Sequence, residues 1–127
     1  MAIVGTGIDI TEVARIAASI ERFGERFLNR VYTPAEIAYC QSKKRGANQS
    51  FAARFAAKEA GMKAIGTGLR RGVTWHDVEV SREPGGRPTI LFHGQAKVFA
   101  AQLGMKRVAL SLTHTENEAM AQVILED

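Results

Sequence analysis

The chain has 127 residues, with 17 Lys and Arg against 13 Asp and Glu, which gives a formal net charge of +4. This length favours one domain, residues 1–127. Its single cysteine, Cys40, excludes an internal disulfide framework and a zinc site built from cysteines. No apolar run approaches the roughly 18 residues of a membrane-spanning helix. The N-terminus lacks the basic and apolar regions of a secretory signal, so we expect a cytoplasmic protein without membrane contact.

Residues 3–10 predict the first strand. Successive strand side chains point to opposite faces, so Ile8 and Ile10 share one face, and Gly7 and Asp9 share the other. We expect Asp9 to lie on the face away from the core. The small glycines beside it would leave room there for a ligand or another backbone.

Helices are predicted to follow this strand. Thr11 is expected to cap a helix over residues 13–23. The segment from Thr33 to Glu36 has the pattern of a capping box with proline at the first helical position, and it predicts a second helix that ends near Gln41.

The second half of the chain is predicted to be rich in strands. A third helix is expected over residues 50–65, and four strands and one more helix are expected after it. The strands are predicted over residues 75–80, 89–92, 107–111 and 119–125, and the helix over 95–103. The resulting order, β-α-α-α-β-β-α-β-β, does not alternate strictly. It therefore favours an α+β fold over a doubly wound parallel sheet.

The third helix, over residues 50–65, is apolar nearly all round and is therefore expected to be buried. It nevertheless carries four charged residues: Arg54, Lys58, Glu59 and Lys63. Burying an unpaired charge is unfavourable, so these groups need partners or a ligand. Internal ion pairs are one possibility, for example between Glu59 and Lys63, which lie one helical turn apart. A site for phosphate and a divalent metal is the other.

Asp9 adds a second carboxylate to this picture. An Asp near the end of a strand and a Glu on a helix can supply two hard oxygen ligands to Mg²⁺, which takes its remaining ligands from water and substrate phosphate. Asp9 also precedes a helix N-terminus, where a carboxylate is favoured for electrostatic reasons alone. Both interpretations of Asp9 stay open at this point.

Three sequence motifs resemble those of one enzyme family. Residues 7–16 read Gly-Ile-Asp-Ile-Thr-Glu-Val-Ala-Arg-Ile, residues 58–60 read Lys-Glu-Ala with Lys-Ala and Gly-Thr-Gly downstream, and residues 111–115 read Ser-Leu-Thr-His-Thr. In this order they resemble the signatures of the bacterial holo-acyl-carrier-protein synthases, which are small stand-alone 4′-phosphopantetheinyl transferases. The motifs span nearly the whole chain, and together they are specific.

The resemblance implies both a fold and a reaction. The fold would be the single-domain α+β fold of 4′-phosphopantetheinyl transferases. The enzyme would transfer the 4′-phosphopantetheine arm of coenzyme A to a serine of apo-acyl carrier protein. The products would be holo-acyl carrier protein and adenosine 3′,5′-bisphosphate, in the service of fatty acid biosynthesis. Members of the family need Mg²⁺ and typically form homotrimers with active sites at the subunit interfaces.

The resemblance also implies roles for individual residues. Asp9 and Glu59 would hold Mg²⁺, and Glu59, or a metal-bound water, would take the serine proton. Lys63 would contact the pyrophosphate or the leaving group as a second catalytic residue. The residues expected to bind coenzyme A are Arg54, Lys58, Lys63, Gly66, Thr67, Gly68, His114 and Thr115.

The resemblance also places the docking of the acidic carrier protein on the first helix. A stripe of arginines lies opposite the apolar face of that helix, and we expect its members to be the docking contacts: Arg15, Arg22 and, if the helix continues, Arg26. A solvated charged face is the alternative meaning of such a stripe.

The charge distribution bears on rival functions. Residues 43–71 contain eight basic residues and one acidic residue, whereas the remaining chain is net acidic. This favours a localised polyphosphate site over general nucleic-acid binding, and the sequence lacks the interleaved aromatic residues that stack on bases. A phosphohydrolase in which the same site activates water remains an alternative, as does a carrier domain of a peptide or polyketide synthase as the acceptor.

Overall fold

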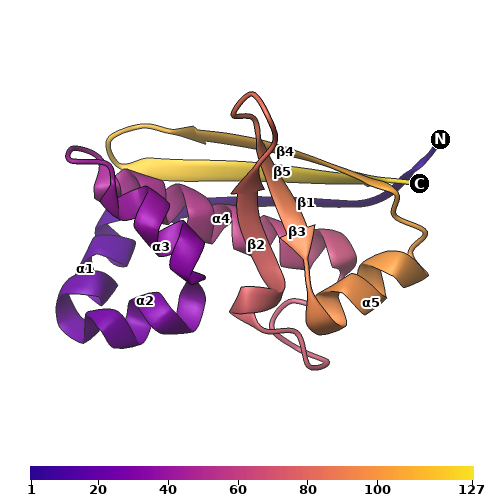
Figure 1. The fold of residues 1–127 in the computed structure, drawn as a ribbon, viewed down its shortest axis with the longest axis horizontal. Coiled ribbons are helices and arrows are strands. Elements are labelled where there is room, and N and C mark those ends of the chain that lie inside the picture. Colours follow the sequence, from indigo (N-terminus) through magenta and orange to yellow (C-terminus); the bar gives the residue numbers. More distant parts are fainter.

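The computed structural model describes residues 1–127 (Figure 1). Its elements in chain order are β1 (Ile3–Glu12), α1 (Val13–Phe23), α2 (Glu25–Val31), α3 (Pro34–Gln41), α4 (Ala47–Ile65), a 3₁₀ turn (Trp75–Asp77), β2 (Val78–Arg82), β3 (Pro88–Phe92), α5 (Gly94–Gln102), β4 (Arg107–His114) and β5 (Glu118–Glu126). The predicted α+β class and order of elements are confirmed. The structure adds the short helix α2, which begins directly after Gly24.

The strands form two antiparallel sheets. One has the order β1-β5-β4, and the other is the hairpin β2-β3. Figure 1 shows the three long strands running side by side, with α4 lying along them and the hairpin crossing in front of α4. The helix is thus enclosed between the two sheets.

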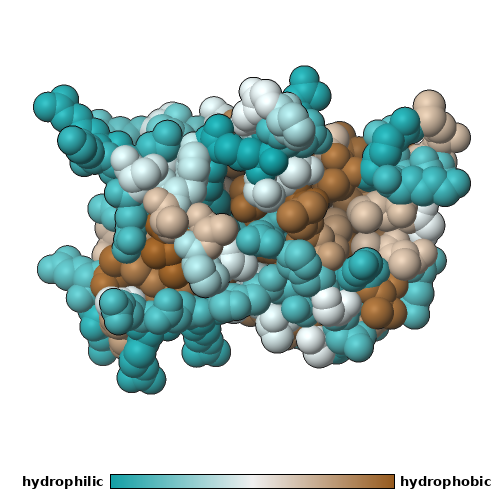
Figure 2. Space-filling view, in the orientation of Figure 1, coloured by the Kyte–Doolittle hydropathy of each residue, from teal (hydrophilic) through white to brown (hydrophobic).

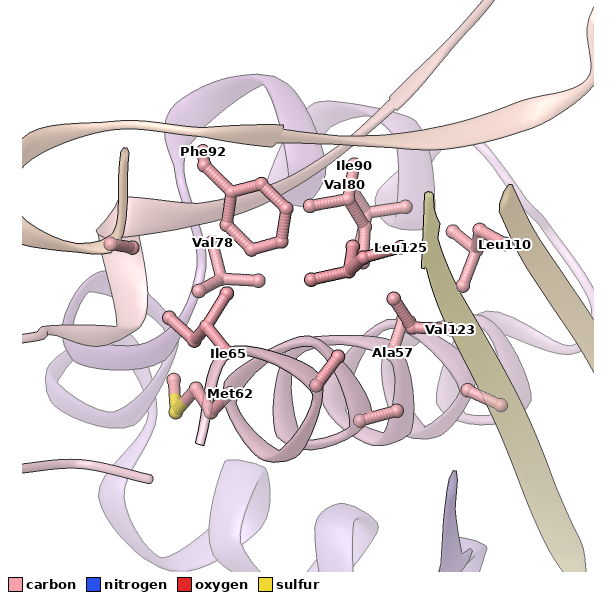
Figure 3. Packing of buried hydrophobic residues seen from close by; sticks show 14 of the residues in the cluster. Ala57, Met62, Ile65, Val78, Val80, Ile90, Phe92, Leu110, Val123 and Leu125 are labelled. Carbon is pink, nitrogen blue, oxygen red and sulfur yellow. The ribbon is translucent and has the colours of Figure 1, made fainter. Parts of the chain in front are cut away.

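Helix α4 forms the centre of the core, as its apolar sequence predicts. All of its residues from Phe51 to Ile65 are buried except Glu59 and Lys63. Figure 3 shows side chains of α4 packed against both sheets, and the labelled residues are Ala57, Met62, Ile65, Val78, Val80, Ile90, Phe92, Leu110, Val123 and Leu125. Because most of the helix surface is covered, the two remaining polar side chains mark the place where it reaches solvent.

The orientation of β1 corrects the expectation from the sequence. Gly5 and Gly7 face α4, and a Cβ atom at Gly7 would lie only 1.9 Å from the carbonyl oxygen of Ala60. Only glycine allows the strand and the helix backbone to approach so closely. Ile8 and Ile10 therefore lie on the opposite face, where each is 56% exposed.

The same orientation turns Asp9 toward the helix instead of away from the core. Asp9 lies two residues after Gly7 on the same face of β1, and its side chain is 14% exposed. The close approach of β1 to α4 therefore brings this carboxylate beside the charged residues of the helix.

Two predicted helix caps have different outcomes. The capping box at Thr33 is confirmed: its hydroxyl accepts from the backbone N–H of Glu36, and the Glu36 carboxylate accepts from the N–H of Thr33. The predicted cap at Thr11 is wrong, because Glu12 occupies the N-cap position of α1 and no side chain caps that helix. The Thr11 hydroxyl instead donates to Asp9.

The outer face of the β1-β5-β4 sheet has no covering layer within the chain. Ile8 and Ile10 of β1 and Met120 of β5 are exposed on it. None of the helices combines the length and hydrophobicity that a membrane span requires.

Candidate active site

Asp9 and Lys63 meet where β1 crosses the last turns of α4. The ammonium of Lys63 donates to the carbonyl oxygen of Ile8 at 2.9 Å and to Oδ1 of Asp9 at 3.2 Å. The second oxygen of Asp9, Oδ2, accepts from the Thr11 hydroxyl at 2.9 Å. Lys63 thus pairs with Asp9 and not with Glu59, the partner that helical spacing alone suggested.

Glu59 lies within electrostatic reach of this pair. Burial is the main cause that raises the pKa of its carboxyl, and the negative charge of Asp9 raises it further. The positive charges of Lys63 and Arg15 act in the opposite direction. The structure therefore brings together the two carboxylates and the lysine that the first two motifs contribute.

The donor set of this cluster suits Mg²⁺. Carboxylate oxygens are the protein ligands that Mg²⁺ prefers, and a cation between Asp9 and Glu59 would relieve their mutual repulsion. No group of three or more His, Cys, Asp or Glu side chains is placed so that it could hold a metal ion. The remaining ligands would have to be water or phosphate oxygens, as is usual for this ion.

Lys58 does not belong to this cluster. Its side chain is fully buried, and its ammonium donates to both carboxylate oxygens of Glu36, at 2.7 and 2.9 Å, and to the carbonyl oxygen of Val78 at 2.8 Å. All three N–H groups are used, so none is left for a phosphate. We therefore remove Lys58 from the predicted coenzyme A ligands, and the buried ion pair is the correct interpretation here.

Arg54 and His114 line a second, separate pocket. Arg54 is buried, and its guanidinium lies 4.1 Å from the ring centroid of Tyr39, a cation–π contact. The pocket has a volume of about 330 Å³, and Lys43 and Arg45 also line it. Four side chains that can carry positive charge thus surround one concave surface, which suits a phosphate group.

Arg54 and Lys63 lie nine residues apart on α4, a rise of about 13 Å along the helix. None of Asp9, Glu59 and Lys63 lines the basic pocket around Arg54. One chain therefore presents the two charged regions as separate surfaces.

The glycine turn after α4 is open to solvent. Gly66 and Gly68 both have left-handed backbone conformations, with φ of 80° and 57°, and nothing lies within 4 Å of a Cβ placed at either. Thr67 is buried between them, and its hydroxyl donates to the carbonyl oxygen of Gly68. The turn can therefore be approached closely by a ligand at both glycines.

Thr115 is used within its own turn. Its hydroxyl accepts from the N–H groups of Asn117 and Glu118 between β4 and β5. His114 precedes it at the end of β4 and is exposed.

Comparison with known proteins identifies the family. The family model of the 4′-phosphopantetheinyl transferase superfamily matches residues 5–123. The chain belongs to this superfamily. Similar proteins include the holo-[acyl-carrier-protein] synthases of Koribacter versatilis, 70% identical over 98% of this chain and 99% of that protein, and of Solibacter usitatus, 58% identical over 98% and 99%. The predicted family and enzyme class are confirmed.

Solved structures of this superfamily share the fold. The holo-[acyl-carrier-protein] synthase of Neisseria meningitidis matches with a TM-score of 0.88 and 32% identity, over 99% of this chain and all of that one. The Helicobacter pylori synthase, determined in complex with coenzyme A, matches with a TM-score of 0.82 and 30% identity, over 95% and 99%.

The three predicted docking arginines lie on the two helices after β1. Arg15 and Arg22 are exposed on α1, and Arg26 is exposed on α2. Arg26 lines a shallow pocket with Phe23, Phe27 and Arg30, the last of which was not predicted. Figure 2 shows a hydrophobic area bordered by hydrophilic side chains at this end of the transferase, over α1 to α3.

Two basic residues of the second pocket, Lys43 and Arg45, were also not predicted as ligands. The sequence shows them in the basic run 43–45, but their distance from the motifs gave no reason to place them beside His114. That proximity comes from the packing of the segment before α4 beside the end of β4, a long-range contact.

Proposed function

We propose that this protein is a cytoplasmic holo-[acyl-carrier-protein] synthase whose residues 1–127 form one catalytic domain. It transfers 4′-phosphopantetheine from coenzyme A to a serine of apo-acyl carrier protein and serves fatty acid biosynthesis. The observation that supports this most directly is the cluster of Asp9, Glu59 and Lys63, because it joins two family motifs at one solvent-accessible point. The names of the similar proteins support the same activity.

The chemistry is a phosphoryl transfer. The serine hydroxyl oxygen attacks the phosphorus that carries the pantetheine arm, and the bond from that phosphorus to the bridging oxygen breaks. Adenosine 3′,5′-bisphosphate leaves with the bridging oxygen, and the serine proton passes to a base. Such reactions depend mainly on positioning and on neutralising charge.

Asp9 and Glu59 would hold Mg²⁺, which when bound neutralises pyrophosphate charge and assists the leaving group. Glu59, or a metal-bound water that it polarises, is the proposed acceptor of the serine proton, because this carboxylate lies beside Asp9 and Lys63. Lys63 donates to the pyrophosphate, since its ammonium is half-exposed at the mouth of the cluster.

Coenzyme A would extend from the cluster of one subunit toward the basic pocket of a neighbouring subunit. Gly66, Thr67 and Gly68 would approach the phosphates through their backbone, while Arg54, His114 and Thr115 would bind the more distant part of the molecule. One chain presents the two surfaces separately, which supports a site assembled from neighbouring subunits.

The exposed outer sheet face supports a homotrimer with active sites at the subunit interfaces. Ile8, Ile10 and Met120 are exposed next to one another on this face, since Ile10 pairs with Met120, and a contiguous exposed apolar patch is typical of a protein interface. Light scattering measures the assembly directly: a mass of three chains is expected, and Ile10→Glu should lower it. A monomeric parent protein with full activity would contradict this part of the proposal.

The acidic carrier protein would dock on Arg15, Arg22 and Arg26. These exposed charges would speed the encounter and orient the carrier more than they would affect the chemical step. The aromatic residues beside Arg26 offer an apolar contact within the same surface.

Intact mass spectrometry tests the proposed activity. The protein is incubated with coenzyme A, Mg²⁺ and apo-acyl carrier protein, and the carrier should gain the mass of one phosphopantetheine arm. Asp9→Ala and Glu59→Ala should each abolish the gain, whereas Lys97→Ala, an exposed change on α5, should not. EDTA should stop the reaction. Release of pantetheine phosphate from coenzyme A without any carrier would instead identify a phosphohydrolase.

A further inference from the structure

The Thr11 hydroxyl makes a specific contact with the proposed metal site. Thr11 lies two residues after Asp9 on the same face of β1, and it is 3% exposed. Its Oγ1 donates to Oδ2 of Asp9 at 2.9 Å. This is the only side-chain hydrogen bond that Thr11 makes, and it does not cap the following helix.

Because of this contact, the two carboxylate oxygens of Asp9 have different hydrogen-bond partners. Oδ2 accepts from the hydroxyl of Thr11, whereas Oδ1 accepts from the Lys63 ammonium. A carboxylate that accepts a fixed donor at one oxygen cannot rotate freely about its last bond. Oδ1 is therefore held toward the Lys63 ammonium.

We infer that Thr11 is a positioning residue that makes Asp9 a one-oxygen ligand, through Oδ1, for the divalent cation. The inference rests on the proposed function, since it concerns the ion that Asp9 and Glu59 would share. Groups that hydrogen-bond to metal ligands orient them, and their loss typically weakens metal binding by about 10- to 100-fold.

Threonine suits this task because its branched side chain restricts rotation about χ1. Thr11 is also buried, which limits the access of water to its hydroxyl. A purely structural explanation is that Asp9 simply satisfies a buried hydroxyl. In that case the loss of the hydroxyl would change folding stability but would leave cation affinity unchanged.

Mn²⁺ binding distinguishes these explanations without requiring turnover. Free Mn²⁺ is measured by electron paramagnetic resonance during titration of the protein with saturating coenzyme A and no carrier protein. Thr11→Val keeps the shape and removes the hydroxyl, so its Mn²⁺ Kd should rise about 10- to 100-fold. Thr11→Ser keeps the hydroxyl and should stay within about threefold of the parent. Thr89→Val, on β3 away from the site, is the matched control.

Thermal unfolding of each variant is measured in parallel, so that only folded proteins are compared. Unchanged Mn²⁺ affinity in folded Thr11→Val would overturn the inference. So would a Thr11→Ser protein that folds but loses affinity, a result that does not depend on the valine variant. If the parent protein binds Mn²⁺ and Asp9→Asn does not, the metal assignment stands whatever Thr11 does. Absence of Mn²⁺ binding by the parent would overturn both.

Discussion

The Lys63 ammonium lies 3.2 Å from Oδ1 of Asp9, at the oxygen that the proposed Mg²⁺ would use. The lysine and the proposed metal ion would therefore be alternative partners for one carboxylate oxygen. Lys63 is 52% exposed, so its long side chain can leave Asp9 at little cost. In the proposed reaction, a bound Mg²⁺ would thus leave this ammonium free to contact the pyrophosphate.

Lys63→Met should separate metal binding from catalysis. Removal of the competing cation should tighten Mn²⁺ binding by up to about fivefold, the range expected for one exposed ion pair of about 1 kcal/mol or less. Transfer to the carrier protein should nevertheless fall, because the pyrophosphate loses a donor. Mn²⁺ titration and carrier mass gain measure the two effects, with Lys97→Met as control. Weaker metal binding in Lys63→Met would contradict the competition.

Glu59→Gln should stabilise the metal-free protein at neutral pH. Burial and the charge of Asp9 raise the pKa of Glu59 in the folded chain. The folded state therefore holds this proton more tightly than the unfolded state, and stability falls as pH rises above the ordinary glutamate value. Glutamine is neutral at every pH, so the variant does not lose this part of the folding stability.

Thermal unfolding in EDTA measures the effect. The midpoint of Glu59→Gln should exceed that of the parent at pH 7.5, and the difference should vanish near pH 4. Transfer activity should fall by about 100-fold or more, because a base and metal ligand is lost. If the parent protein were as stable as Glu59→Gln at pH 7.5, or more stable, the ionised Glu59 would not destabilise the folded state.

Lys58→Met should destabilise the fold by about 3–5 kcal/mol, because it leaves Glu36 as an uncompensated buried charge. Adding Glu36→Gln should recover part of the loss, which a double-mutant cycle in urea measures. Coenzyme A affinity of the folded variant, measured by calorimetry, should match that of the parent. Weaker coenzyme A binding with unchanged stability would return Lys58 to the ligand set.

The fold was largely predictable because its local signals are strong. The capping box at Thr33 fixes where α3 begins, and the apolar sequence of α4 predicts its burial. The orientation of β1 was not predictable from hydrophobicity. Alternation alone predicts that Ile8 and Ile10 point to the core. The close contact of Gly7 with α4 instead turns the other face of β1 to the core.

Only the part of the candidate site that consists of motif residues could be predicted from the sequence. Asp9, Glu59 and Lys63 lie in the motifs and meet in the structure. Lys58 lies in a motif too, but its partner Glu36 comes from another helix, 22 residues away in the chain. Long-range pairs of this kind leave no periodic signal in a single sequence.

Two docking arginines should differ in kinetic effect. Arg22→Ala should raise the KM for the carrier by up to about fivefold, equivalent to roughly 1 kcal/mol, and reduce the salt dependence, with kcat unchanged. Arg15→Ala should also lower kcat, because the positive charge of Arg15 lowers the pKa of Glu59 and so favours the ionised carboxylate that the reaction needs. Steady-state kinetics at several salt concentrations measure both, with Arg107→Ala as control. Equal kcat for Arg15→Ala and the parent would confine Arg15 to docking.

The Cys40 thiol should be unreactive in the folded protein. It is completely buried, and burial raises its pKa to about 12, so almost no thiolate forms at pH 8. A disulfide reagent such as dithionitrobenzoate should label it only after unfolding in urea. In the unfolded chain the thiol loses its proton at lower pH than in the folded protein. Folding stability should therefore fall as pH rises from about 9 toward 12, visible as a lower urea midpoint at pH 10 than at pH 8. Rapid labelling of the native protein at pH 8 would contradict the burial of this thiol.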